Sequence, residues 1–188
     1  GSGLSEESNS EKKATNSPPV FLVINEIYYD VESSDTDGEV FIELYGTPGA
    51  DLSGFTVKII NGSDGKKLDM ITIPADTKIP DDGYFVIADS KTGSKTETNV
   101  SNPDLVDNFD PQNGPDAIQL LSPQGVLVDA LAYGEGVVSQ ASNGLATSEG
   151  AAAPDVASGH SLSRVQGANT QNNLADFVDS ETPSPGNL

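Results

Sequence analysis

Two glutamates and the single arginine of this chain are the residues whose types and spacing could do chemistry. Glu26 lies in the apolar run at 20–29, and Glu43 lies in the run at 39–46. If these runs form neighbouring antiparallel strands, the glutamates lie close together on one face, and paired carboxylates occur in glycoside hydrolysis and in metal sites. Buried carboxylates also serve as acceptors for backbone N–H groups or for a cation. Because a lone arginine in an acidic chain should find a carboxylate, we predict a structural ion pair of Arg164 with Glu26 and Glu43.

The acidic connection between these two runs is a second candidate site. Asp35, Asp37 and Glu39 alternate around Gly38, and Ca²⁺ binds about 6–8 oxygen ligands of this kind. The spacing resembles the start of an EF-hand loop, but the twelfth position counted from Asp35 is Gly46, which has no carboxylate. Asp and Gly are also ordinary turn residues. The connection therefore predicts either a plain turn or a weak Ca²⁺ site with Asp35, Asp37 and Glu39 as ligands, and no cofactor is required.

A nucleophilic enzyme site is not indicated. His160 is the only histidine, with Ser161 and Ser163 beside it, but a triad needs an oriented base and a nucleophile on a rigid turn. The chain has no G-x-S-x-G, no glycine-rich phosphate loop and no H-E-x-x-H. The absence of cysteine excludes thiolate nucleophiles, zinc–thiolate sites and iron–sulfur clusters. We predict that the chain is not an enzyme.

The tyrosines are the remaining candidates for binding. They lie at or near the ends of apolar runs, at Tyr28, Tyr29, Tyr45, Tyr84 and Tyr133. Tyrosines at strand ends usually pack their rings and send the hydroxyl to the rim. An exposed pair would instead be able to stack on a sugar or a peptide.

Short apolar runs must position these residues. They are rich in Val, Ile, Phe and Tyr, several of them alternate with polar residues, and they lie at 20–29, 39–46, 54–60, 68–73, 83–89, 116–122, 125–133 and 160–165. No long stretch has helical periodicity. About eight strands separated by Gly, Pro, Asp and Asn clusters predict an all-β sandwich. The segments at 61–67 and 122–125 have the residues of hairpin turns.

Two polar segments, 90–115 and 134–159, exceed normal loop lengths. Each is expected to be an excursion over the sandwich or partly mobile, and 104–109 in the first could form a helical turn. Residues 1–19 are Ser-rich and lack periodic apolar residues, so they are predicted to be a flexible linker before a domain at 20–188. A tether of this kind often follows the anchoring cysteine of a bacterial lipoprotein, so a lipid anchor upstream is expected.

The formal net charge of −20 restricts the partners. The longest basic clusters are pairs, and a surface this acidic repels phosphate backbones, so no nucleic acid is expected. Binding to an anionic membrane is disfavoured for the same reason. No apolar run approaches the roughly 18 residues that cross a bilayer. Solubility, divalent cations and a basic partner all suit such a surface.

The order of the segments resembles the lamin tail domain family. The matching segments are "INEIYY" (24–29), "EVFIELYG" (39–46), "DLSGF" (51–55), "IPDDGYFVIAD" (79–89), "DAIQLLSPQGVLVDALAY" (116–133), "GHSLSR" (159–164) and "TPSPGNL" (182–188). The resemblance covers 20–188 and rests on the order of seven motifs, each weak alone. Phe55 replaces the usual Trp, and the insertion at 134–159 is long.

This resemblance implies an immunoglobulin-like β-sandwich of about eight strands. It also implies a secreted, periplasmic or cell-surface bacterial module, including lipoproteins, that mediates adhesion or docks an unknown protein or surface polymer. The alternative it implies is an accessory domain of a secreted nuclease or other hydrolase whose catalytic domain lies outside this chain.

Overall fold

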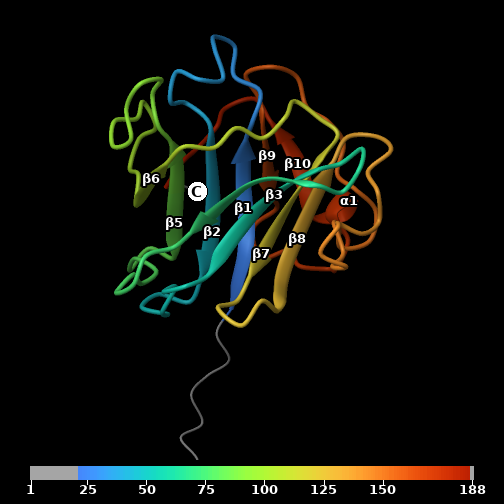
Figure 1. Ribbon diagram of the computed structural model, residues 1–188, viewed down its shortest axis with the longest axis horizontal. Coiled ribbons are helices and arrows are strands. Elements are labelled where there is room, and N and C mark those ends of the chain that lie inside the picture. The colour runs from blue at the N-terminus through green and yellow to red at the C-terminus, as the bar shows by residue number, and fades with distance from the viewer. Residues whose placement is uncertain (1–20, 187–188) are drawn as a thin grey trace, which may run out of the picture.

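Ten strands and one short helix make up residues 21–186, the part of the chain that the computed structural model describes (Figure 1). They are β1 (Leu22–Tyr28), β2 (Phe41–Gly46), β3 (Thr56–Asn61), β4 (Lys67–Thr72), β5 (Tyr84–Asp89), β6 (Leu105–Asp107), β7 (Asp116–Leu121), β8 (Leu127–Tyr133), β9 (Ser161–Arg164), α1 (Asn173–Asp176) and β10 (Phe177–Ser180). All eight predicted strands are present, and β6 and β10 add to them. The predicted linker at 1–19 lies outside the described residues.

Two sheets face each other. One has the order β10-β9-β1-β2-β5-β6 and the other has the order β4-β3-β7-β8, with antiparallel pairing except between β5 and β6. Alternate residues of each strand point into the space between the sheets, where Ile24, Ile42, Ile59, Ile118 and Leu131 are fully buried. The all-β, immunoglobulin-like sandwich expected from the sequence is confirmed. Among the described residues, no helix is long and apolar enough to span a membrane.

A β-bulge in β1 decides which side chains face outward. Ile24 pairs with Leu44, but the next registered pair is Glu26 with Glu43, so Asn25 is the extra residue. The bulge shifts the alternation by one position. As a result Ile27 continues the buried row begun by Ile24, and Glu26 turns to the outer face of the six-stranded sheet.

The first excursion, 90–115, packs against the outer side of β5 and β2. Val100 is buried there with Phe41 and Val86. The helical turn considered for 104–109 is wrong. Leu105–Asp107 instead forms β6, because its backbone pairs in parallel with β5 and Asp104 accepts a hydrogen bond from the Val86 N–H at 2.8 Å.

The second excursion, 134–159, covers the outer face of the four-stranded sheet. Ala141 packs against Ile60 and Ala117. Gln119 projects from β7 into this layer and donates to the carbonyls of Leu145 and Ala146, at 3.3 and 2.9 Å. Both long segments are therefore excursions packed on the sandwich, the first of the two alternatives that the sequence left open.

The end of the described chain crosses the outer face of the six-stranded sheet. We call residues 181–186 the C-terminal strap. It leaves β10 at one sheet edge and reaches β2, where the Gly186 N–H donates to Glu43. Pro183 and Pro185 form one wall of a small hollow against Tyr28 and Phe41. The strap covers the glutamates on this face.

Candidate functional site

Glu26 and Glu43 lie directly opposite each other beneath the C-terminal strap, with exposed fractions of 1% and 0%. Glu26 accepts a hydrogen bond from the Ser161 hydroxyl at 2.6 Å. The strap residue Ser184 donates its backbone N–H and its hydroxyl to Glu26, both at 3.0 Å. Glu26 is therefore an acceptor that fastens the strap to the sheet.

Glu43 has the same role on the neighbouring strand. It accepts hydrogen bonds from Asn25 Nδ2 at 2.7 Å and from the Gly186 N–H at 2.6 Å. Burial raises the pKa of Glu43 to about 7, although these two hydrogen bonds oppose the shift, and the charge of Glu26 adds to it. Glu43 thus exchanges a proton near neutral pH while buried under the chain's own backbone. The pair acts as structural acceptors, a role that the sequence left open beside an ion pair.

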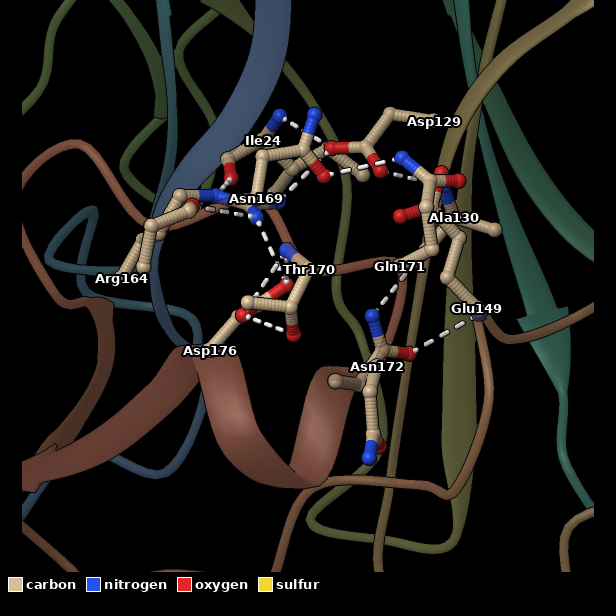
Figure 2. Close-up of polar contacts among 12 residues, drawn as sticks. Ile24, Asp129, Ala130, Glu149, Arg164, Asn169, Thr170, Gln171, Asn172 and Asp176 are labelled. Atoms are coloured by element: carbon tan, nitrogen blue, oxygen red, sulfur yellow. Dashed lines mark hydrogen bonds and ion pairs between the residues drawn. The ribbon is translucent and has the colours of Figure 1, made fainter.

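Arg164 does not pair with either glutamate, so that element of the prediction is wrong. Its guanidinium bonds Asp129 at 3.0 Å and lies 3.5 Å from Asp176 (Figure 2). It also donates to the carbonyls of Ile24 and Ala168, at 2.9 and 3.1 Å. The arginine is 6% exposed. It is a buried, fully paired cation.

Strand alternation explains the difference. In β9, Ser161 and Ser163 share the outer face with Glu26, whereas Leu162 lies in the core between the sheets. Arg164 follows Leu162 by two residues and points the same way, toward Asp129 on β8. The sheet itself separates the arginine from the glutamates.

A second carboxyl shares the Arg164 cluster. Glu149 lies beside Asp129, and its Oε2 is buried with no hydrogen-bond partner among residues 21–186 when no proton is placed on it. Burial, together with the neighbouring Asp129, raises the pKa of Glu149 to about 7. Because Arg164 favours the ionised form of Asp129, we assign the proton to Glu149, which then donates to Asp129.

Asp129, Glu149 and Asp176 were missed in the sequence. Asp129 left a signal, since it is an acid within the otherwise apolar stretch at 126–133. A buried strand tolerates such a residue only when it is paired. Asp176 left none, because it lies in a one-turn helix and its contact with Arg164 is tertiary.

The carboxylates of the acidic connection are engaged in local hydrogen bonds or spread apart. Asp35 accepts a hydrogen bond from the Val31 N–H at 3.1 Å, and Glu39 accepts one from the Ser33 hydroxyl at 2.6 Å. Asp37 pairs through its backbone with the first excursion. Within the described part of the chain, no three His, Cys, Asp or Glu side chains are placed to share a metal ion. The structure thus does not bring Asp35, Asp37 and Glu39 together as ligands.

His160 and Ser161 do not form a base–nucleophile pair. Its Nδ1 lies 2.7 Å from Asp179 Oδ1 at the surface. The neighbouring Ser161 hydroxyl is buried and donates to Glu26, away from the ring. A base and a nucleophile that do not meet cannot carry out acyl transfer.

A hollow of about 240 Å³ lies between the two buried clusters, at the end of the six-stranded sheet where β2 ends and β5 begins. Its wall is formed by Asn25, Tyr45, Tyr84, Ser163, Gln166 and Ser184, with Arg164 behind it. Asn25 and Ser184 connect this wall to the glutamate pair, and Arg164 connects it to the aspartates. Both clusters therefore hold the hollow in shape.

Several polar atoms on this wall have no partner among the described residues. Within residues 21–186, no hydrogen bond is made by the hydroxyls of Tyr45 and Tyr84, by Ser163 Oγ or by the Gln166 amide. The Asn25 amide uses its nitrogen on Glu43 and leaves its oxygen without a donor. The hollow is thus a place where uncommitted donors and acceptors converge beside aromatic rings.

Comparison with protein families identifies the architecture. The model of the lamin tail domain family matches residues 15–135, which is more than half of the chain. The match includes β1, β2 and the β7–β8 hairpin, which carry the glutamates and Asp129. A search among curated proteins finds no match. The chain belongs to the lamin tail domain family.

Proposed function

We propose that this chain is a non-catalytic docking module whose ligand enters the hollow between Tyr45, Tyr84 and Gln166. The observation that carries this proposal is the convergence of unpartnered polar groups on that wall. The residues that could have been catalytic have other tasks. Glu26 and Glu43 hold the C-terminal strap, and His160 pairs with an aspartate at the surface.

The rigid surroundings favour docking over a mobile catalytic centre. Pockets that bind ligands are usually preformed and combine aromatic walls with a few fixed polar groups. Here Tyr45 and Tyr84 project from neighbouring registered strands, and Asn25 is fixed through Glu43. A ligand would therefore meet a wall that needs little ordering on binding.

A location outside the cytoplasm belongs to the proposal, as a secreted, periplasmic or tethered surface module that mediates adhesion. The family resemblance supports it. Protease treatment of intact cells that express the full-length gene product tests it. Cleavage without lysis supports the external location, and protection until lysis contradicts it.

Amide chemical shifts in ¹⁵N-labelled protein test the docking site. Four probe classes would be titrated separately: neutral oligosaccharides, a lysine-rich peptide, an aspartate-rich peptide and an aromatic tripeptide. We expect at least one class to shift the signals of Asn25, Tyr45, Tyr84 and Gln166 in a saturable manner. If no class shifts them, or if all shifts map to other surfaces, the hollow is not the docking site.

A further inference from the structure

The wall of the hollow includes a fixed aromatic platform. Tyr45 is 37% exposed. The Tyr84 ring lies 4.9 Å from it with a tilt of 45°, and Phe21 meets it edge-on at 6.3 Å. Beneath it lies Gly83, where a Cβ would come within 2.8 Å of Tyr45 Cε2. Glycine at this position lets one edge of the Tyr45 ring approach the backbone closely, and the residue remains partly exposed on the wall of the hollow.

The charges around the hollow disfavour an anionic ligand. Arg164 is the one charged residue on the wall, and Asp129 and Asp176 already neutralise it. An anionic ligand would therefore find no free cation, and it would lie above the buried glutamate pair. No carboxylate belongs to the wall, so an ammonium group would find no direct ion-pair partner among the wall side chains, although Glu43, Asp82 and Glu26 lie close to Tyr84. The wall's own side chains therefore suit a neutral ligand that forms hydrogen bonds.

The hydrogen-bonding groups specify the ligand further. The hydroxyls of Tyr45, Tyr84 and Ser163 each donate and accept, and the Gln166 amide does both. A ligand that matches these donors and acceptors carries several hydroxyl groups on adjacent atoms. A ligand that also covers the Tyr45 ring needs a flat apolar face.

A saccharide ring has both properties, because its C–H groups form an apolar face and its hydroxyls surround the edge. The volume of about 240 Å³ lies below the usual 300–1,000 Å³ of a site for a drug-sized molecule. The hollow therefore has room for one ring and not for a buried chain.

We infer that the hollow binds one ring of a neutral saccharide, as a terminal or side-chain unit of a surface polysaccharide. Tyr45 is the stacking platform, and Asn25, Ser163, Gln166 and Tyr84 bond the hydroxyls. This inference rests on the docking function proposed above and names its ligand class.

The test is a titration of ¹⁵N-labelled protein with cellohexaose, mannohexaose and N-acetylchitohexaose, each to about 10 mM so that a millimolar Kd saturates. We expect at least one sugar to shift the signals of Tyr45, Tyr84 and Gln166. Tyr45→Ala should weaken its binding by about tenfold or more, as truncation of an aromatic anchor does. Gln166→Ala should weaken it by about threefold, because one hydrogen bond is lost.

Gln166→Ala guards against a folding artefact, because this exposed side chain has no partner in the described chain and its loss should leave Tm unchanged. Val126→Ala is the matched control. Val126 is 62% exposed in the turn between β7 and β8, and its replacement should leave affinity unchanged.

The opposing outcomes separate this inference from the docking proposal. If no sugar shifts the wall but N-acetyl-lysine methylamide or one of the peptides does, the saccharide assignment is wrong and the docking site stands. If neither sugars nor the other probes shift it, both are wrong. If a sugar binds to the Gln166→Ala and Tyr45→Ala variants as tightly as to the parent protein, it binds outside the hollow and the inference fails.

Discussion

The outer face of the six-stranded sheet buries Glu26 and Glu43 without a cation, whereas the interior beside it buries Asp129 and Asp176 around Arg164. On the outer face, backbone N–H groups, hydroxyls and an amide donate hydrogen bonds to the two glutamates. Inside, one guanidinium provides most of the neutralisation (Figure 2). Both clusters border the same hollow.

The comparison shows two ways of keeping carboxylates out of water, with different sensitivities. On the outer face several weak donors together stabilise the buried carboxylates, so the loss of one donor leaves the others in place. In the interior a single buried cation provides this stabilisation, so loss of the cation leaves unpaired charges in a medium of low dielectric constant. Each cluster also contains one carboxyl whose pKa is raised by burial to about 7, Glu43 on the outer face and Glu149 beside Asp129.

Replacement of Arg164 should have the largest effect. Arg164→Met keeps much of the side-chain length but removes the charge that Asp129 and Asp176 face. We expect the free energy of unfolding to fall by about 3–5 kcal/mol, as when one partner of a buried ion pair is removed. Urea denaturation measures it. Arg164→Lys should lower the free energy of unfolding less, since it keeps the charge. An Arg164→Met variant whose free energy of unfolding lies within about 1 kcal/mol of the parent value would contradict the role of Arg164.

The fold could be predicted to a large extent, because strand alternation and turn residues are local signals. All eight runs became strands. β6 and β10 were not predicted, because they are only three and four residues long and depend on tertiary pairing with β5 and β9.

The candidate site was less accessible to sequence reasoning. The proximity of Glu26 and Glu43 follows from strands that neighbour in sequence. The partners of Arg164 do not, since Asp129 lies 35 residues away in the other sheet. The hollow depends on the Asn25 bulge and on the strap, and no local sequence pattern predicts either of them.

Removal of the C-terminal strap should have the next largest effect. A chain that ends at Ser180 loses the donors of Ser184 and Gly186, which we expect to lower the free energy of unfolding by about 2 kcal/mol. Water then reaches Glu43, so its pKa should fall from about 7 toward the ordinary value. Carboxyl ¹³C shifts followed against pH measure this change. Ser184→Ala removes one hydroxyl donor and serves as the mild comparison, and an unchanged Glu43 pKa in the truncated chain would show that the strap is not what buries it.

A pH series should show that mildly acidic conditions stabilise the fold. Burial raises the pKa of Glu43 and Glu149 to about 7 and of Asp89 and Asp116 to about 6. Between the ordinary and raised values, the folded protein holds protons that the unfolded chain has released. The free energy of unfolding should therefore fall as pH rises from about 4.5 to about 7.

Glu43→Gln isolates the outer cluster in the same series. Glutamine resembles the protonated carboxyl and keeps an acceptor for the Gly186 N–H. We expect its stability to depend less on pH than that of the parent, with the gain relative to the parent greatest at pH values above about 7. Thermal unfolding at matched ionic strength measures it. Two parallel pH profiles would show that Glu43 does not titrate in this range.

Added Ca²⁺ should have the smallest effect. The carboxylates of Asp35 and Glu39 already accept hydrogen bonds from nearby donors, and within residues 21–186 these two and Asp37 do not form a group of three that could share a metal ion. A site with a Kd weaker than about 1 mM adds less than about 0.4 kcal/mol at about 1 mM Ca²⁺. Thermal unfolding with Ca²⁺ or with EDTA, and with Mg²⁺ as the control for ionic strength, should therefore give nearly equal Tm values. A saturable rise in Tm specific to Ca²⁺, lost in Asp37→Asn, would reveal a metal ion as a third means of neutralising carboxylates beside the strap and the arginine.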